Sequence, residues 1–130
     1  IPAGRKSDAI FATIDFMPTF ASLCGFNVPD DRKIDGVDQT NLLLGKSEKG
    51  RETFYFDRAG IRKGKWKYLK ADAHFYGYAR EDNRPKEEEL YNLEKDLGEK
   101  KNLSKKHPKI LVELRRLTES MPKGGPSGIR

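Results

Sequence analysis

The sequence predicts an α+β fold, in which a small antiparallel sheet of about three to four strands packs against a C-terminal helix. Two observations support this. Residues 59–68, "AGIRKGKWKY", have the pattern of a β-hairpin, and a third strand pattern, "EELYNL", follows at 88–93. Apolar residues of 108–121 then recur at helical spacing. Strands followed by one amphipathic helix are typical of a two-layer α+β arrangement.

The hairpin pattern predicts which residues face the core. If Lys63 and Gly64 form a two-residue turn, Ile61 lies opposite Trp66 and Ala59 lies opposite Tyr68. Both pairs then share one face of the sheet. The other face takes the polar or small residues Gly60, Arg62, Lys65 and Lys67. Before the hairpin, "RETFYF" at 51–56 alternates as a strand does, with Phe54 and Phe56 on one side.

The C-terminal helix has clear signals. Pro108 suits the first helical position, where the missing N–H has no intrahelical partner. Four apolar residues then form a one-sided stripe: Ile110, Leu114, Leu117 and Met121. We expect 71–87 to be a long loop and 122–130 to be a flexible tail.

A short helix is predicted earlier in the chain. Asp15 can be its N-cap, and Gly25 follows as a stop signal. Three apolar side chains fall on one face, Phe16, Phe20 and Leu23. This face needs a large partner, and residues 27–130 offer little that could cover it. Residues 27–50 form a connector with one short helix near 38–44, capped by Asp38 or Thr40 and ended by Gly45.

Composition limits the classes of protein that fit. A chain of 130 residues suits one ordinary domain. No apolar run approaches the roughly 20 residues that a membrane helix needs. The start, "IPAGRKSDAIF", has no signal-peptide core and no Met, so we expect a piece of a longer protein. The single Cys24 excludes an internal disulfide framework and a cysteine-based metal cluster.

The charge is uneven along the chain. Residues 1–50 hold six Lys/Arg and seven Asp/Glu, whereas 51–130 hold twenty and thirteen, so the net charge of +6 lies in the second part. A basic half can indicate an anionic partner, although acidic residues are interleaved with the basic ones. A small basic binding module for an anionic polymer or nucleic acid therefore stays an alternative.

Catalytic and metal-binding patterns are scarce. An EF-hand loop that started at Asp30 would place Arg32 at a ligand position and Asp35 where glycine is required, so the pattern fails. We interpret Asp35-Gly36 as turn chemistry. Nothing in the sequence brings His74 and His107 together.

The order of the segments resembles a known family. The chain contains a "PAG" loop, a helix with the motif Asp-x-x-Pro-Thr at Asp15, Pro18 and Thr19, and a connector with "DG". It continues with "GIRKGKWKYL", "ELYNLEKDLGEKKNL" and a final helix. This series resembles the C-terminal portion of the type I, formylglycine-dependent sulfatases, arylsulfatase-like sulfuric ester hydrolases of the alkaline phosphatase superfamily.

The resemblance implies a domain organisation. Residues 1–26 would be the tail of the sulfatase catalytic domain, so that the first helix belongs to the α/β catalytic domain of the parent enzyme. Residues 27–50 would be a connector, 51–121 the C-terminal subdomain and 122–130 a flexible tail. The partner is then the N-terminal catalytic domain of the same protein, and neither nucleic acid nor a membrane is expected.

The resemblance also implies a function for the whole enzyme, which is calcium-dependent hydrolysis of a sulfate ester of a sugar or small molecule in a periplasmic or secreted protein. The nucleophile motif C/S-x-P/A-x-R does not match at Cys24, so formylglycine, calcium ligands and sulfate-binding residues are expected upstream of residue 1. We therefore expect no catalytic residue, no metal ligand and no activity in this chain alone. Its loops would help to select the substrate, with Arg58 at a strand start and His74, Tyr76 and Arg80 as the candidate substrate-lining residues.

Overall fold

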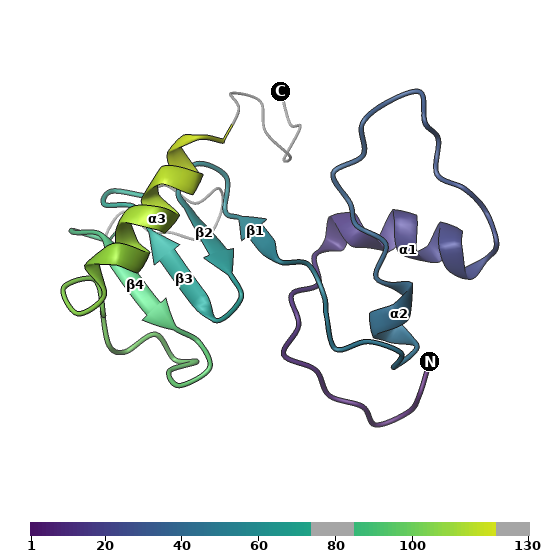
Figure 1. Ribbon diagram of the computed structural model, residues 1–130, viewed down its shortest axis with the longest axis horizontal. Helices are drawn as coiled ribbons and strands as arrows, with labels where there is room; N and C mark the ends of the chain where they lie inside the picture. Colours follow the sequence, from purple (N-terminus) through teal and green to yellow (C-terminus); the bar gives the residue numbers. More distant parts are fainter. Residues whose placement is uncertain (74–84, 122–130) are drawn as a thin grey trace. The chain divides into compact units, whose positions relative to one another are not determined.

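The computed structural model describes residues 1–73 and 85–121, and the chain divides into two compact units, Ile1–Glu52 and Thr53–Arg130 (Figure 1). The first unit contains a 3₁₀ turn, η1 (Thr13–Asp15), and two α-helices, α1 (Phe16–Leu23) and α2 (Thr40–Leu43). The second contains the strands β1 (Thr53–Tyr55), β2 (Gly60–Lys63), β3 (Trp66–Leu69) and β4 (Glu89–Asn92), and the helix α3 (Pro108–Glu119). None of the helices in these described ranges has the length and apolar content that crossing a membrane requires.

The two helices of the first unit end as their sequences predict. Gly25, at φ +75°, follows α1, and the Phe26 N–H donates back to the Ala21 carbonyl at 2.8 Å. Asp38 Oδ1 accepts the Thr40 N–H at 2.8 Å at the start of α2, and Gly45, at φ +74°, follows its end. Two segments of this unit pair in an isolated antiparallel bridge between Ile10 and Arg51, in which the Arg51 N–H donates to the Ile10 carbonyl at 3.1 Å.

The second unit is a four-stranded antiparallel sheet in the order β1-β2-β3-β4, with α3 lying across one face (Figure 1). Its buried core contains one residue from each of the three last strands and one from the helix: Ile61, Tyr68, Leu90 and Leu114. The predicted stripe on α3 is confirmed, because Ile110 and Leu117 pack against this core and Met121 is buried. The α+β prediction is therefore confirmed, as are the strand at 88–93 and Pro108 at the start of the helix.

The predicted register of the hairpin is wrong by two residues. The turn contains Gly64 and Lys65 instead of Lys63 and Gly64, so Ile61 pairs with Tyr68 and Lys63 pairs with Trp66. The physical reason is the conformation of Gly64, whose φ of +52° suits the first central position of a two-residue turn. Because side chains alternate with a period of two, a shift of two residues keeps Ile61, Trp66 and Tyr68 on the face that was predicted.

The first strand is shorter than predicted. β1 covers only Thr53–Tyr55, and Arg51 instead pairs with Ile10 in the first unit. Most of the predicted loop at 71–87 and the tail at 122–130 lie outside the described residues.

Candidate functional site

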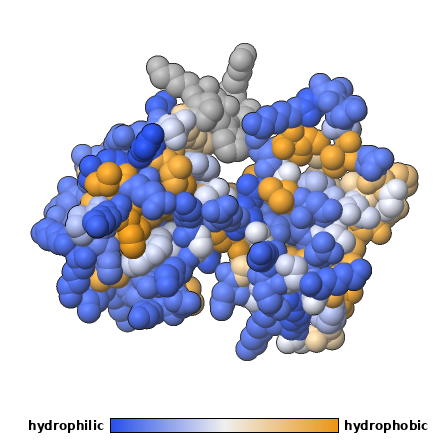
Figure 2. Space-filling view, viewed as in Figure 1, coloured by the Kyte–Doolittle hydropathy of each residue, from blue (hydrophilic) through white to orange (hydrophobic). Residues whose placement is uncertain are grey.

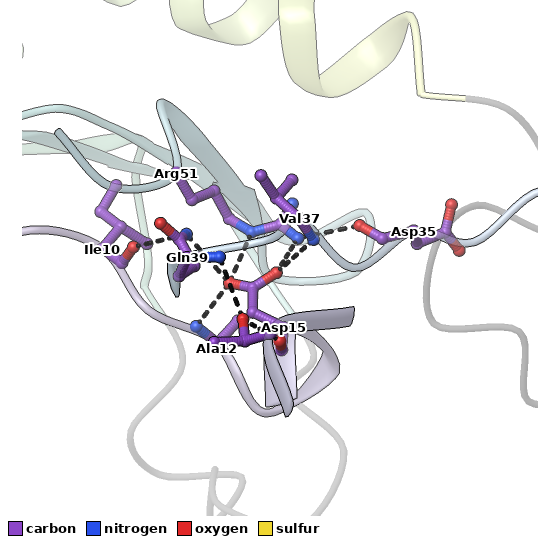
Figure 3. A network of polar contacts seen from close by, with 8 residues as sticks. Ile10, Ala12, Asp15, Asp35, Val37, Gln39 and Arg51 are labelled. Atoms are coloured by element: carbon purple, nitrogen blue, oxygen red, sulfur yellow. Dashed lines mark hydrogen bonds and ion pairs between the residues drawn. The ribbon is translucent and has the colours of Figure 1, made fainter. Parts of the chain in front are cut away.

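The most highly connected polar group of the first unit is the carboxylate of Asp15, which is completely buried (Figure 3). Its Oδ2 accepts the Ala12 N–H at 2.9 Å, and its Oδ1 accepts the Val37 N–H at 2.8 Å. The Arg51 guanidinium donates from Nε to Oδ2 at 3.2 Å and from Nη2 to Oδ1. The Gln39 amide adds a longer contact to Oδ2 at 3.4 Å. One carboxylate thus joins residues 12, 37, 39 and 51.

Asp15 has a different role from the predicted helix cap. It occupies the N-cap position of α1, but its side chain makes no hydrogen bond to the first turn of that helix. Its partner Arg51 also donates from Nη2 to the Asp35 carbonyl at 2.8 Å (Figure 3). This hydrogen bond extends the network to the predicted Asp35-Gly36 turn.

Thr19 and Gly36 add further contacts between the start of α1 and residues 35–39. The Thr19 hydroxyl donates to the Asp15 carbonyl at 2.6 Å and accepts the Gln39 N–H at 3.0 Å. A Cβ at Gly36 would lie 2.1 Å from the Ile14 carbonyl oxygen and 2.9 Å from Pro18 Cγ, so only glycine allows this close approach. The segment 35–39 is therefore held directly against the start of α1.

The Asp15 network has a structural function, since it connects residues 12, 37, 39 and 51. Burial raises the pKa of Asp15, but the hydrogen bonds from Arg51, Val37, Ala12 and Gln39 outweigh it and hold the pKa at about 2. The carboxylate is thus charged at neutral pH, fully hydrogen-bonded and shielded from solvent. It has no free lone pair for a proton transfer or a metal ion.

A second buried polar group lies in the sheet unit. The Tyr68 hydroxyl donates to Glu88 Oε1 at 2.6 Å, and Arg115 of α3 donates to Glu88 from Nε at 2.7 Å and from Nη2. The hydrogen bonds from Arg115 lower the pKa of Glu88 although partial burial raises it. Burial, and then the Glu88 carboxylate, raise the pKa of Tyr68. Both groups therefore keep one protonation state near neutral pH, and this cluster ties α3 to the sheet.

Of the four predicted substrate-lining residues, Arg58 lies within the described residues. Arg58 is exposed, but it lies in the turn between β1 and β2, not at a strand start as predicted. Asp57 has a φ of +51°, and the Ala59 N–H donates to the Phe56 carbonyl at 3.0 Å, so the turn closes before β2 begins at Gly60. His74, Tyr76 and Arg80 lie outside the described residues.

Metal-ligating side chains do not converge in the described ranges, 1–73 and 85–121. No three His, Cys, Asp or Glu residues there form a group that could hold a metal ion. The acidic residues of the connector have other partners. Asp31 pairs with Arg32, and Asp38 accepts the Thr40 N–H.

Sequence reasoning missed Arg51 and Gln39 as partners of Asp15. The alternation of 51–56 predicts a strand that includes Arg51, and Gln39 lies in the predicted connector, so neither side chain is predicted to contact Asp15. The only sequence signal is indirect. Asp15 and Thr19 belong to the Asp-x-x-Pro-Thr motif, which indicates that their side chains have specific contacts.

An exposed apolar surface lies on α1. Phe16, Phe20 and Leu23 are 44%, 50% and 38% exposed, in spite of their spacing on one face of the helix. The Phe16 and Phe20 rings stack on each other, with centroids 5.2 Å apart. Hydrophobic side chains at the surface are visible as orange atoms among the blue hydrophilic ones (Figure 2). The first unit thus does not cover this face itself.

No family model matches the chain, but individual proteins do. The N-acetylgalactosamine-6-O-sulfatase of Bacteroides thetaiotaomicron is 34% identical over 124 residues, which cover 90% of this chain and 24% of that relative. A solved structure from a study of glycosaminoglycan metabolism in the same organism has a TM-score of 0.70 and 34% identity, over 88% of this chain and 25% of its own.

A further solved structure extends the comparison. It is a protein in complex with its substrate D-glucosamine-2-N,6-O-disulfate, and it has a TM-score of 0.60 and 29% identity over 92% of this chain and 25% of its own. The present chain thus spans about a quarter of the length of the proteins that it matches almost from end to end. It belongs with the sulfatases, of which it matches a C-terminal portion.

Proposed function

We propose that this chain is the C-terminal part of a sulfatase that hydrolyses sulfate esters of sugars. One observation carries this proposal. The similarity to an N-acetylgalactosamine-6-O-sulfatase extends over 90% of the chain, and the fold agrees with a related solved structure at a TM-score of 0.70. The protein solved with D-glucosamine-2-N,6-O-disulfate supports a sulfated sugar as the class of substrate.

Within such an enzyme this chain would support the structure and help to select the substrate. The Asp15 network fixes residues 35–39 and Arg51 to the start of α1, and the Glu88 cluster fixes α3 to the sheet. The described residues do not fit a calcium site, and we assign no step of the reaction to a metal here. Formylglycine and any calcium would be held by the catalytic domain that precedes this chain.

The exposed face of α1 supports a partner of this kind. Phe16, Phe20 and Leu23 would lose their contact with water if the helix packed against the catalytic domain, and burial of large apolar side chains is the main driving force of such contacts. The first unit would thus be anchored to the rest of the enzyme through α1.

The decisive experiment compares the full-length protein with residues 1–130 alone. We expect the full-length protein, with calcium, to release sulfate from N-acetylgalactosamine 6-sulfate, and the isolated chain to release none. Sulfate is measured directly, and the unsulfated sugar serves as the blank. Release of sulfate by residues 1–130 alone, or none by the full-length protein from a panel of sulfated sugars, would refute the proposal.

A second experiment tests the selection of substrate. We propose that Arg58, His74, Tyr76 and Arg80 contribute aromatic and basic groups near the substrate. In the full-length enzyme, His74→Ala and Arg80→Ala should then change kcat/KM unequally across several sulfate esters. Lys49→Ala, an exposed lysine of the first unit, is the matched control. Unchanged kcat/KM for all esters would remove these residues from the substrate site.

A further inference from the structure

A group of lysines lies just before α3 and in its first turn, and it has no part in either polar cluster. Between Glu99 and Glu113 the chain has no acidic residue, and it has five lysines: Lys100, Lys101, Lys105, Lys106 and Lys109. All five are exposed. Residues 100–109, here called the lysine segment, lead from the region after β4 into the first turn of α3, on a strongly hydrophilic part of the surface (Figure 2).

The backbone of the lysine segment is fixed. The Asp96 carboxylate accepts the N–H groups of Lys100 at 3.1 Å and Lys101 at 2.8 Å. Leu103 donates to the Leu90 carbonyl of β4 at 2.8 Å, and Asn102 Oδ1 accepts the Leu90 N–H at 3.2 Å. The lysines are therefore presented from a rigid support, which reduces the entropy that binding a ligand would cost.

The charges of the lysine segment are largely uncompensated. Among the described residues only Lys105 has a carboxylate within ion-pair distance, Glu87 at 3.8 Å, and both side chains are exposed, so that this pair is weak. The nearest acidic residues along the chain have other partners. Glu99 binds Lys67 at 2.7 Å, and Glu113 binds Lys63 at 2.7 Å. The segment is thus a local source of positive potential.

An aromatic pair connects the lysine segment to β3. The imidazole of His107 is exposed and packs against Trp66 of β3, with ring centroids 5.1 Å apart and planes tilted by 58°. Lysines lie on both sides of His107 along the chain, at 105, 106 and 109. An apolar ring edge between cationic groups suits a ligand that combines C–H surfaces with anionic groups.

We propose that the lysine segment, with His107, binds a sulfated polysaccharide chain. This inference rests on the proposed function, because a sulfatase of sulfated sugars meets polymers that carry repeated sulfate groups. Lysines present point charges that suit sulfate groups. Single-stranded nucleic acid is less suited, because Trp66 already packs against His107 and is half-buried, and base stacking needs an open ring face.

Binding to residues 1–130 tests this proposal directly. The probe is chondroitin sulfate, and affinity is measured by calorimetry at several salt concentrations. We expect Lys105→Ala/Lys106→Ala to weaken binding about tenfold and to reduce its salt dependence. Lys46→Ala/Lys49→Ala removes two exposed lysines of the first unit and should bind as the unchanged chain does. Trp66 fluorescence checks that each variant is folded.

Three results would overturn the proposal: unchanged affinity of Lys105→Ala/Lys106→Ala, equal binding of the unsulfated polymer hyaluronan, or equal binding of a single-stranded oligonucleotide.

The kinetics of the full-length enzyme separate this inference from the proposed function. The double variant should raise KM for the polymer and leave KM for the sulfated monosaccharide unchanged. Absence of all sulfate release would refute the proposed function, whereas the binding of chondroitin sulfate to residues 1–130 is measured without turnover.

Discussion

Each defined position of the Asp-x-x-Pro-Thr motif makes a specific contact at the start of α1. Asp15 accepts hydrogen bonds from residues 12, 37, 39 and 51, and Thr19 bridges Asp15 to Gln39. Pro18 lies against Gly36, at a distance that leaves no room for a Cβ. The motif therefore holds a connector in place.

Replacing Asp15 with asparagine should loosen this connection. Both carboxylate oxygens accept a backbone N–H, so the asparagine NH₂ must face either Ala12 or Val37, and Arg51 loses its counter-ion. We expect a cost of about 3 kcal/mol, because one partner of a buried ion pair is removed. Hydrogen exchange of the Ala12 and Val37 amides measures this cost, and the protection of both amides should fall about a hundredfold. The control is Asp31→Asn, whose exposed carboxylate pairs only with the adjacent Arg32, and equal losses in both variants would contradict the argument.

The same carboxylate predicts a loss of stability in acid. The pKa of Asp15 is about 2 in the folded chain and near 3.8 for an ordinary aspartate, so the folded state favours the ionised form. The resulting stabilisation, about 2 kcal/mol, is fully present above pH 4 and is lost as the pH falls from about 4 to about 2. Protection of the Ala12 and Val37 amides, corrected for the intrinsic pH dependence of exchange, should decrease over this range. In Asp15→Asn it should stay flat. A decrease of the same size in that variant would assign the effect to another group.

The packing of α3 on the sheet depends on one helix face. Leu114 is 2% exposed and contacts the cluster that Ile61, Tyr68 and Leu90 form. Leu114→Ala should therefore destabilise the second unit by about 3 kcal/mol, through lost burial and a cavity. Denaturation followed by the fluorescence of Trp66, the only tryptophan, reports on this unit. Val112→Ala changes an exposed residue of the same helix and should leave the midpoint nearly unchanged. An equal loss of stability in both variants would show that the buried contacts of Leu114 are not its cause.

The elements of the second unit could be predicted because their apolar residues follow one periodicity each. Strand alternation gave the core face of Ile61, Trp66 and Tyr68 correctly, although the turn was misplaced. The period of two fixes the face, whereas the register depends on which turn position Gly64 occupies. The Asp15 network could not be predicted in this way. Its members, Gln39 and Arg51 among them, come from separate segments, and polar pairing over such distances leaves no periodic trace in a sequence.

At the scale of the whole chain, the exposed row on α1 stands out, because the first unit does not cover it. Under the proposed function, this row packs against the catalytic domain of the same protein. The similarity to about a quarter of longer sulfatases agrees with a partner in the same protein. Replacing the residues of this row should therefore reduce self-association of the isolated chain and destabilise the full-length enzyme.

We expect Phe16→Ser/Phe20→Ser to reduce self-association of residues 1–130 at high concentration, because these exposed rings drive contacts between copies. In the full-length enzyme the same change should lower the free energy of unfolding by about 4 kcal/mol, since two phenylalanine side chains would lose their burial. Analytical ultracentrifugation of the chain and thermal unfolding of the enzyme measure the two effects. Val112→Ser, which replaces an exposed apolar residue of α3, is the control and should change neither. If the full-length enzyme keeps its stability with both serines, the α1 face stays in solvent. A contact other than this helix would then connect residues 1–130 to the catalytic domain.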